Sequence, residues 1–440
     1  MLKYKPLEIW LRKQPGWVFS VYAILAAFST YACMYAFRKT YTAAGFEGFT
    51  FWGLEFKTLL IISQILGYTI SKFIGIKIVA EMTPNRRAWS ILGFIMFSHL
   101  ALLFFWLIPP PYSILFLFLN GLPLGMVWGL VFSFLEGRRN TELLGAGLSV
   151  SFIVSSGVVK SVGSWLMISW GVSEFAMPFI TGVLFSMPLF LFVWLLNHIP
   201  PPTAEDEILR VKRIPMNREQ RWQFFKQFAL GIVVLTFSYL FLTAFRDLRD
   251  NYALEILEAV GYVDNAEIFT LTEIPIAIVV LIVMASLMLI KNNHKALLVN
   301  HFIIGFGIAM IGLSTFAFTS GWVSPYWWMV LVGLGSYLGY VPFNCILFDR
   351  FIATYRTMAN AGFLIYIADS FGYLSSVGVL LYKNFGHAEI SWYQFFINFS
   401  YAVSFIGLGL TIISIYYFSF IKEAAPEKVQ NLSNQVVPQI

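Results

Sequence analysis

The chain has 440 residues, of which 58% are hydrophobic and only 12% are charged. A mean hydropathy of +0.74 excludes a soluble globular protein, because such proteins contain roughly 45–50% apolar residues and need more charge to cover their surface. The net charge of +6 does not indicate nucleic-acid binding, because the basic residues stand between apolar runs, as they do in membrane proteins.

Twelve apolar runs, each about 20 residues long, predict helices that cross the membrane. In chain order, the predicted spans are 17–44, 55–80, 88–108, 112–135, 143–168, 177–198, 228–252, 266–290, 297–318, 326–349, 360–383 and 396–420. The first run is too long for the apolar part of a signal peptide, so we interpret it as a retained helix. The sequence therefore predicts an all-α integral membrane protein.

Basic residues gather in alternate connections between the spans. They include Arg86 with Arg87, Arg138 with Arg139, and several residues of 210–226, whereas the opposite connections hold acidic residues. Because positively charged connections remain in the cytoplasm, we expect a multi-pass protein of the inner (cytoplasmic) membrane with both termini in the cytoplasm.

The longest polar stretch between spans, 200–221, has six predicted spans on either side. It is too short and too polar to bury a core, which favours a linker over a folded domain. We expect an N-terminal six-helix bundle at 1–199, a cytoplasmic linker at 200–226, a C-terminal six-helix bundle at 227–421 and a cytoplasmic tail at 422–440.

The two halves share a short repeat. The segments from Tyr31 to Arg38 and from Tyr239 to Arg246 both read Tyr-x4-Ala-Phe-Arg, in the first and seventh spans. In transporters built from parallel repeats, equivalent residues meet near the middle of the membrane at the interface between the repeats. The repeat therefore predicts that Arg38 and Arg246 face one central cavity.

An arginine inside a span is costly and usually marks a substrate path. The paired N–H groups of a guanidinium suit two oxygens of a phosphate, and the tyrosines Tyr31, Tyr35 and Tyr239 are expected to donate hydrogen bonds to the same solute. Two unbalanced arginines in an empty site should also oppose its reorientation, which favours exchange over uniport. In the alternative interpretation, Arg38 reaches the outer interface from the end of its span.

Several patches of the sequence resemble a known family. They are Tyr35-Ala-Phe-Arg38-Lys39, Ser71-Lys72-Phe73 and Glu273-Ile-Pro275. In these residues the chain resembles the organophosphate:phosphate antiporters of the major facilitator superfamily, the group of the glycerol-3-phosphate and hexose-phosphate transporters. The resemblance implies twelve helices in two pseudo-symmetric six-helix bundles, a phosphoryl group bound by the two arginines, and interhelical salt bridges made by Lys39.

The chain departs from that family in other charged residues. Its fifth span lacks the family's histidine and carries Lys160, and Asp369 in the eleventh span has no expected counterpart. In a bundle of this type the second span faces the eleventh and the fifth faces the eighth, which predicts the ion pairs Lys72–Asp369 and Lys160–Glu273. Such pairs either open and close during transport or only neutralise charge; alternatively, Lys72 belongs to the anion site. The residues predicted to form the gating salt bridges are Lys39, Lys160, Asp250, Glu273 and Asp369.

The expected partner is a small anionic solute, an organophosphate or phosphate, carried by a monomer in the lipid bilayer. Two alternatives are a transporter-like membrane sensor of an organophosphate and a proton-coupled transporter of another organic anion. The sequence has no zinc-binding, nucleotide-binding or nucleophile motif, so we expect neither an enzyme nor a metal or other cofactor.

Overall fold

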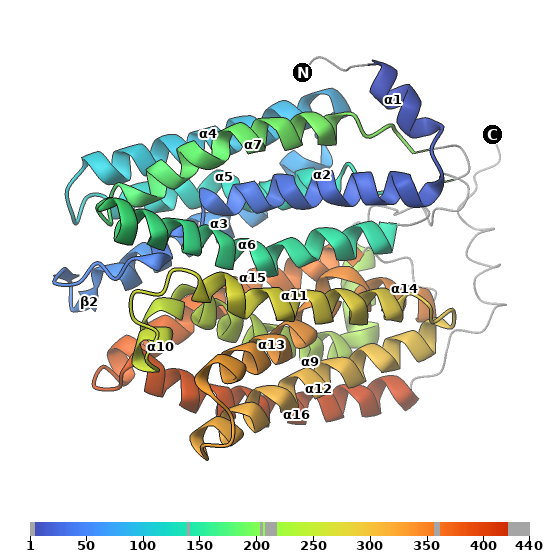
Figure 1. The fold of residues 1–440 in the computed structure, drawn as a ribbon. Coiled ribbons are helices and arrows are strands. Elements are labelled where there is room, and N and C mark those ends of the chain that lie inside the picture. Colours follow the sequence, from blue (N-terminus) through green and yellow to red (C-terminus); the bar gives the residue numbers. More distant parts are fainter. Residues whose placement is uncertain (1–4, 139–140, 203–205, 207–217, 356–360, 421–440) are drawn as a thin grey trace, which may run out of the picture.

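The protein is almost entirely helical (Figure 1). A computed structural model describes the chain except for residues 1–4, 139–140, 203–205, 207–217, 356–360 and 421–440. The expected tail at 422–440 therefore lies outside the described residues. Within them, the only sheet is a two-stranded ribbon of β1 (Thr50–Phe51) and β2 (Leu54–Glu55).

Each half contributes six long helices. Those of the first half are α2 (Gly16–Ala36), α3 (Phe56–Ala80), α4 (Pro84–Leu107), α5 (Ile114–Phe132), α6 (Thr141–Trp170) and α7 (Met177–Asn197). Those of the second half are α9 (Arg218–Asn251), α11 (Ile268–Leu287), α12 (Asn293–Thr319), α13 (Pro325–Cys345), α15 (Ala361–Leu381) and α16 (Trp392–Phe420). The shorter helices are α1 (Lys5–Arg12), η1 (Thr40–Ala43), α10 (Ala253–Ala259), α14 (Leu347–Tyr355) and η2 (Tyr382–Gly386).

The long helices match the predicted spans. Among the described residues, ten helices are long and apolar enough to cross a membrane, and α13 with α14, bent by 47°, makes eleven. The remaining long helix, α15, has 21 residues and occupies the place of the eleventh predicted span. The predicted fold class, an all-α membrane protein of two six-helix bundles, is confirmed.

The two halves pack in the same way. In the first half α2 packs against α6 and α7, while α3 and α4 pack against α5. In the second half the equivalent helices make the equivalent contacts, α9 with α15 and α16, and α11 and α12 with α13. Between the halves, α3 lies against α15 and α6 against α11, as predicted for these spans. Figure 1 shows the two bundles stacked, blue to green above and yellow to red below.

Two glycines bring α3 and α5 close together. A Cβ added at Gly67 would lie 2.2 Å from the carbonyl oxygen of Phe118, and one added at Gly121 would lie 2.3 Å from that of Gln64. Only glycine fits at so close an approach, and small residues at such contacts are typical of membrane helices. The contact fixes the position of α3, which carries Lys72.

The first span is shorter than predicted. Helix α2 ends at Ala36 instead of continuing to residue 44, and the chain then turns into η1. Two buried side-chain amides donate hydrogen bonds to backbone carbonyl groups just after the end of the helix. Asn120 donates to the carbonyl of Phe37 (2.9 Å), and Gln64 donates to that of Arg38 (2.8 Å). The helix therefore stops inside the bundle and places Arg38 just beyond its C-terminal end.

We predict that Gly67→Ala lowers the free energy of unfolding by about 1–3 kcal/mol, because the added methyl group meets backbone atoms that cannot move aside. Thermal unfolding of the purified protein in detergent measures this change. The matched control is Gly93→Ala in α4, where a Cβ has open space, and it should stabilise the helix by about 1 kcal/mol. Equal effects of the two substitutions would contradict the packing argument.

Candidate functional site

A cavity of about 960 Å³ lies between the two halves. Side chains of both bundles line it, from α2, α3, α5 and α6 on one side and from α9, α13 and α15 on the other. Five of the six residues predicted to bind the solute are among its lining residues, namely Tyr31, Tyr35, Arg38, Lys72 and Arg246. The repeat thus does bring the two arginines to one cavity.

Arg38 is buried at the cavity wall. Its side chain comes from the turn after α2, the residue is 7% exposed, and its guanidinium carbon lies 3.9 Å from the centre of the Tyr68 ring. Its Nε has no hydrogen-bond partner, and no carboxylate of the described residues lies within ion-pair distance of it. The alternative that Arg38 reaches the outer interface is therefore wrong, and its charge faces the cavity without a counter-ion.

Arg246 repeats this arrangement in the second half. Its guanidinium carbon lies 3.9 Å from the centre of the Tyr340 ring, which matches the distance between Arg38 and Tyr68. Unlike Arg38, it also pairs with a carboxylate, that of Asp247, at 2.7 Å. The two arginines thus share their aromatic support but differ in charge balance.

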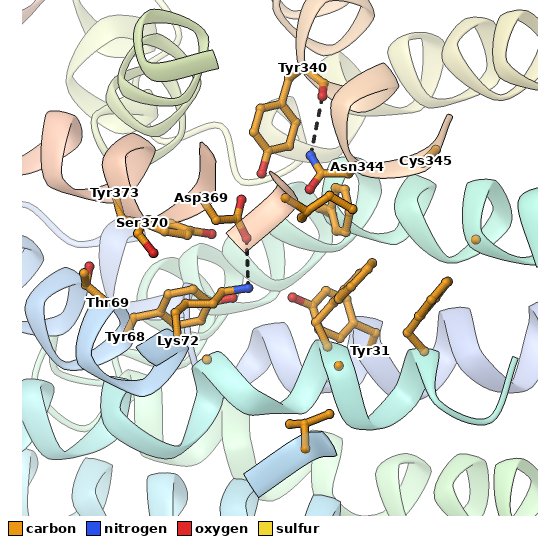
Figure 2. Close-up of a pocket in the computed structure, with 18 of the residues that line it drawn as sticks. Tyr31, Tyr68, Thr69, Lys72, Tyr340, Asn344, Cys345, Asp369, Ser370 and Tyr373 are labelled. Atoms are coloured by element: carbon orange, nitrogen blue, oxygen red, sulfur yellow. Dashed lines mark hydrogen bonds and ion pairs between the residues drawn. The ribbon is translucent and has the colours of Figure 1, made fainter. Parts of the chain in front are cut away.

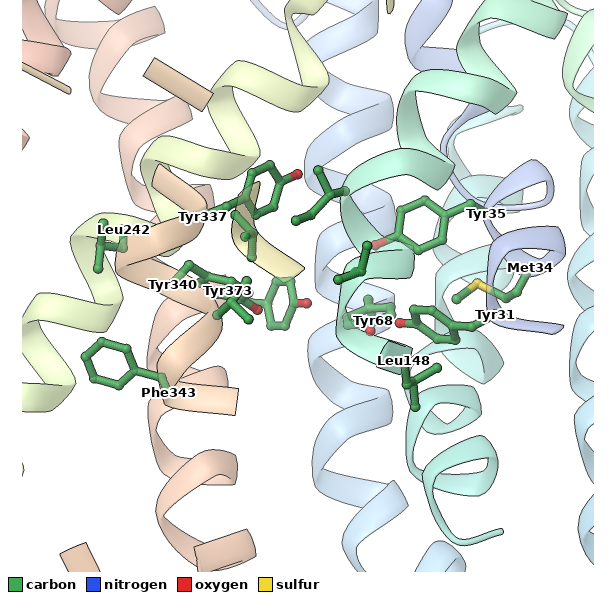
Figure 3. Packing of buried hydrophobic residues seen from close by; sticks show 14 of the residues in the cluster. Tyr31, Met34, Tyr35, Tyr68, Leu148, Leu242, Tyr337, Tyr340, Phe343 and Tyr373 are labelled. Atoms are coloured by element: carbon green, nitrogen blue, oxygen red, sulfur yellow. The ribbon is translucent and has the colours of Figure 1, made fainter. Parts of the chain in front are cut away.

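Tyrosines from both halves face each other across the cavity. Figure 3 shows the hydroxyl groups of Tyr31 and Tyr35 directed toward Tyr337, Tyr340 and Tyr373 of the other half. Such side chains combine an apolar ring with a polar tip, which suits a solute that has both hydroxyl groups and an apolar body.

Tyr239 lies behind this layer. Its ring stacks on Tyr340 with 5.0 Å between the ring centres, and its hydroxyl donates a hydrogen bond to Asp369. It is absent from the described lining of the cavity. The prediction that Tyr239 contacts the solute is not supported by its position, because its hydroxyl group is turned toward a carboxylate of its own half.

Lys72 and Asp369 form the predicted ion pair. The Nζ of Lys72 on α3 lies 3.1 Å from Oδ2 of Asp369 on α15, and both side chains are 8% exposed. Figure 2 shows the pair at the cavity wall beside Tyr68 and Tyr373. It joins the two halves near the centre of the molecule.

The second predicted pair, Lys160 with Glu273, is wrong. Lys160 instead lies 2.5 Å from Oδ1 of Asp250. Glu273 pairs at 2.6 Å with Arg249 of its own half. The helices α6 and α11 do pack together as expected, but Arg249 is nearer to Glu273 and takes its carboxylate.

Asp250 connects the halves at one end of the cavity. It accepts the ammonium groups of Lys39 at 2.7 Å and Lys160 at 2.5 Å, together with the hydroxyl of Ser156. Lys39 also donates to Asn251 at 2.6 Å. The interhelical salt bridge that the resemblance implied for Lys39 is thus present.

Further contacts close the same end, which carries the β1–β2 ribbon and α10. The Nζ of Lys57 lies 2.5 Å from the carboxylate of Glu255, and the hydroxyls of Thr58 and Tyr252 are 2.7 Å apart. Burial raises the pKa of the Glu255 carboxyl above its ordinary value, and the neighbouring Lys57 opposes this shift. At the opposite end, the cavity extends to residues at the tips of helices and in the loop after α5, among them Glu136, Thr141 and Asp349.

The charges around the cavity do not balance. Among the described residues, six cations at or beside its wall face five carboxylates, which leaves an excess of one positive charge. The cations are Arg38, Lys39, Lys72, Arg87, Lys160 and Arg246, and the carboxylates are Glu136, Asp247, Asp250, Asp349 and Asp369. No described group of three or more His, Cys, Asp or Glu side chains is arranged to hold a metal ion.

The sequence reasoning missed several of these residues. Asp247 and Arg249 belong to the run Phe-Arg-Asp-Leu-Arg-Asp that ends α9, and four charges so close together in an apolar span were a usable signal. Tyr68 precedes Lys72 by one helical turn and so shares its face. Tyr340 and Tyr373 carry no comparable signal, because tyrosines are common throughout the chain.

We predict that Asp250→Asn destabilises the folded protein by about 3–5 kcal/mol, because it leaves the buried ammonium groups of Lys39 and Lys160 without their counter-ion. Thermal unfolding measures the loss. The control is Asp264→Asn, at an exposed loop position with a positive φ of 53° that asparagine also adopts easily. If both variants unfold alike, Asp250 does not hold the halves together.

Several solved structures with a similar fold are membrane transporters by their titles. A nucleoside transporter, NupG, matches with a TM-score of 0.59 and 12% sequence identity, over 92% of this chain and 99% of that one. A D-xylose–proton symporter matches with a TM-score of 0.58 and 13% identity, over 92% and 98%. A peptide transporter, POT, in complex with sulfate, matches with a TM-score of 0.55 and 15% identity, over 92% and 94%. These likenesses establish the major facilitator fold.

Sequence comparison adds the family. No curated protein matches the chain. Residues 40–420 match the model of a protein family, which is most of the length of the chain. The chain, with its major facilitator fold, therefore belongs to the family described as "Family of unknown function (DUF5690)".

Proposed function

We propose that the protein is a secondary transporter of a small anionic, phosphate-bearing solute, which it moves by alternating access in exchange for inorganic phosphate. The observation that carries the proposal is the unpaired positive charge of the cavity. Arg38 is buried there without a carboxylate among the described residues. A buried charge without a partner is costly, so the site favours a ligand that supplies the missing negative charge.

The position of the two guanidinium groups supports an oxyanion as the ligand. Each guanidinium lies against the face of a tyrosine, Arg38 on Tyr68 and Arg246 on Tyr340. A contact over the ring face uses none of the N–H groups of the guanidinium as hydrogen-bond donors, and those that Asp247 does not bind suit paired oxygens of phosphate or carboxylate.

The size of the cavity supports a solute larger than phosphate alone. Sites for small organic molecules measure about 300–1,000 Å³, and this cavity, at about 960 Å³, belongs at the upper end of that range. Facing tyrosines such as Tyr35 and Tyr337 supply hydroxyl groups and ring faces for an organic portion of the solute. Phosphate is then the small exchange partner and an organophosphate the larger one.

The contacts between the halves support alternating access. Salt bridges join the halves at the end with α10, whereas the cavity extends to the other end. We propose that the bundles 1–199 and 227–421 rock against each other along the α3–α15 and α6–α11 contacts. In this proposal 200–226 is the cytoplasmic linker, within which α9 already begins at Arg218.

The orientation follows from the basic connections. Arg87 and Arg138 lie at the end to which the cavity extends, and positive connections remain in the cytoplasm. We therefore place the open end in the cytoplasm and the protein in the inner membrane, with both termini in the cytoplasm. Because one chain encloses the whole cavity, we propose that it works as a monomer.

Exchange is the mode favoured by the charge excess. An empty cavity with an unbalanced positive charge resists closure, because closure removes the water that solvates this charge. The transported solutes of the solved neighbours, D-xylose, nucleosides and peptides in their titles, support transport as such. The patches 35–39, 71–73 and 273–275 support kinship with the organophosphate:phosphate antiporters.

The direct test is counterflow in proteoliposomes. Vesicles loaded with unlabelled phosphate should take up labelled phosphate, and external glycerol-3-phosphate or hexose phosphates should compete, because all share the phosphoryl group. Vesicles without internal phosphate should take up little. Saturable phosphate binding without any counterflow would instead favour a membrane sensor, and the absence of both would reject the anion site.

We further predict that Arg38→Lys and Arg246→Lys each reduce the exchange rate about ten- to a hundredfold. Lysine keeps the charge but loses the paired N–H geometry, and a charge-assisted hydrogen bond contributes about 1.5–3 kcal/mol. The control is Arg12→Lys on α1, where the arginine side chain is 54% exposed and pairs only with Glu8 among the described residues. Full exchange activity in both cavity variants would make the arginines structural.

A further inference from the structure

A pair of stacked aromatic side chains lies in the cavity wall of the first half. Trp128 and Phe132 on α5 both line the cavity, and their rings stack with 5.0 Å between the ring centres and 6° between the ring planes. Both residues are partly exposed, whereas Val127, Leu130 and Val131 of the same turns are buried. The two rings, which we call the aromatic shelf, therefore face the cavity and not the core of the bundle.

The aromatic shelf lies between the arginines and the open end of the cavity. A Cβ added at Gly125 would lie 2.8 Å from the carbonyl oxygen of Tyr68, the tyrosine that supports Arg38. Trp128 and Phe132 come later in the same helix, about 4.5 Å and 10 Å further toward the open end. A phosphoryl group at Arg38 therefore places the rest of an organophosphate beside the shelf, with room for a sugar in between.

The position of Phe152 on α6 gives the same spacing independently. A Cβ added at Gly145 would lie 3.3 Å from the ring of Phe132. Phe152 lies about 10 Å further along α6, and its ring centre is 6.5 Å from that of Tyr340, the tyrosine that supports Arg246. Measured along the helices, the far end of the aromatic shelf is thus about 10 Å from the level of both arginines.

The second half places an amide across the cavity from the shelf. Asn344 lines the cavity on α13, one helical turn beyond Tyr340 toward the open end (Figure 2). Its Nδ2 donates to the hydroxyl of Tyr239 at 3.3 Å and to the carbonyl of Tyr340 at 3.4 Å. Among the described residues, its Oδ1 contacts the same hydroxyl at 3.5 Å, but this hydroxyl already donates to Asp369. The amide oxygen is therefore available to accept a hydrogen bond from a solute.

A flat ring and a side-chain amide together select a particular kind of organic group. Flat rings stack on aromatic side chains, and such stacking stabilises a bound base whatever its identity, because every base has a π-face. A carboxamide offers a donor and an acceptor in one plane, which matches the edge of a nitrogen heterocycle. A saturated sugar or an alkyl chain has neither the flat face nor the N–H groups at its edge.

We propose that the solute carries a planar nitrogen heterocycle joined through a sugar to its phosphoryl group, as in a nucleoside monophosphate. The phosphoryl group binds at Arg38 and Arg246, the heterocycle stacks on the aromatic shelf, and an N–H group at its edge donates to Oδ1 of Asn344. This inference rests on the proposed anion site and names the class of solute that the same cavity selects.

The test compares two phosphates that share the phosphoryl group and the sugar but differ in the base. Full-length protein is reconstituted in vesicles loaded with phosphate, and adenosine monophosphate or ribose-5-phosphate competes with the uptake of labelled phosphate. Adenosine monophosphate should halve the uptake at a concentration about ten- to a hundredfold lower, because stacking of one base contributes that much affinity. Phenyl phosphate should likewise compete better than cyclohexyl phosphate, because only the phenyl ring is flat.

Three substitutions separate stacking from hydrogen bonding. Trp128→Leu should remove most of the preference for adenosine monophosphate over ribose-5-phosphate, whereas Trp128→Phe, which keeps a flat ring, should retain most of it. Asn344→Leu should weaken adenosine monophosphate relative to phenyl phosphate, which has no N–H group at its edge. The matched control is Trp106→Leu, which removes a tryptophan stacked on Phe179 outside the described cavity lining and should leave both preferences as they are in the native protein.

The outcomes separate the heterocycle site from the anion site. Phosphate exchange with equal competition by the two sugar phosphates, or a preference that persists in Trp128→Leu, would overturn the heterocycle site and leave anion exchange standing. Binding of neither phosphate nor adenosine monophosphate would contradict both. If the native protein binds adenosine monophosphate without exchanging phosphate, the exchange is contradicted, and a preference lost in Trp128→Leu by calorimetry supports the heterocycle site. If Trp128→Leu does not fold, Phe132→Leu tests the same shelf.

Discussion

Charged side chains between the two halves lie where the dielectric constant is low, so each needs a counter-charge close by. Carboxylates are scarce there, and Asp250 serves two lysines at once, Lys39 and Lys160. These shared contacts hold one end of the molecule closed, and the Lys72–Asp369 pair joins its centre. The same scarcity leaves Arg38 without a partner among the described residues. The scarcity of carboxylates therefore explains both the shared salt bridges that join the halves and the positive charge that would attract a solute.

The internal repeat explains where the arginines are but not how they differ. Both repeats end in Ala-Phe-Arg, and both guanidiniums lie 3.9 Å from a tyrosine ring centre. The supporting tyrosines come from helices that are not equivalent, Tyr68 from α3 and Tyr340 from α13. The next residue is a lysine after Arg38 and an aspartate after Arg246. The repeat thus supplies two matching cations, and different neighbouring residues leave one of them paired and the other without a carboxylate partner among the described residues.

Hydropathy and charge pattern were enough to predict the twelve spans and the two halves, because the thickness of the bilayer sets the length of an apolar helix. They could not predict the early end of α2, which depends on amides of other helices that bind the carbonyls of Phe37 and Arg38. The Lys72–Asp369 pair was predictable because each of the two facing spans holds one charged residue deep within it, and these two charges have opposite signs. The partner of Lys160 was not predictable. Asp250 and Glu273 are both candidate partners, Arg249 also pairs with Glu273, and only the side-chain geometry decides which pairs form.

The early end of α2 also has an electrostatic consequence. The aligned peptide dipoles of a helix place about half a negative elementary charge at its C-terminus, which stabilises nearby cations. Helix α2 ends at Ala36, in the interior of the bundle. Arg38 and Lys39 follow after a single intervening residue. If the helix crossed the whole bilayer, its C-terminal partial charge would lie in the polar surface region, where water and salt screen it. By stopping short, α2 provides a fixed, non-titrating negative potential beneath Arg38, which lets an unpaired cation persist in the interior between one bound anion and the next.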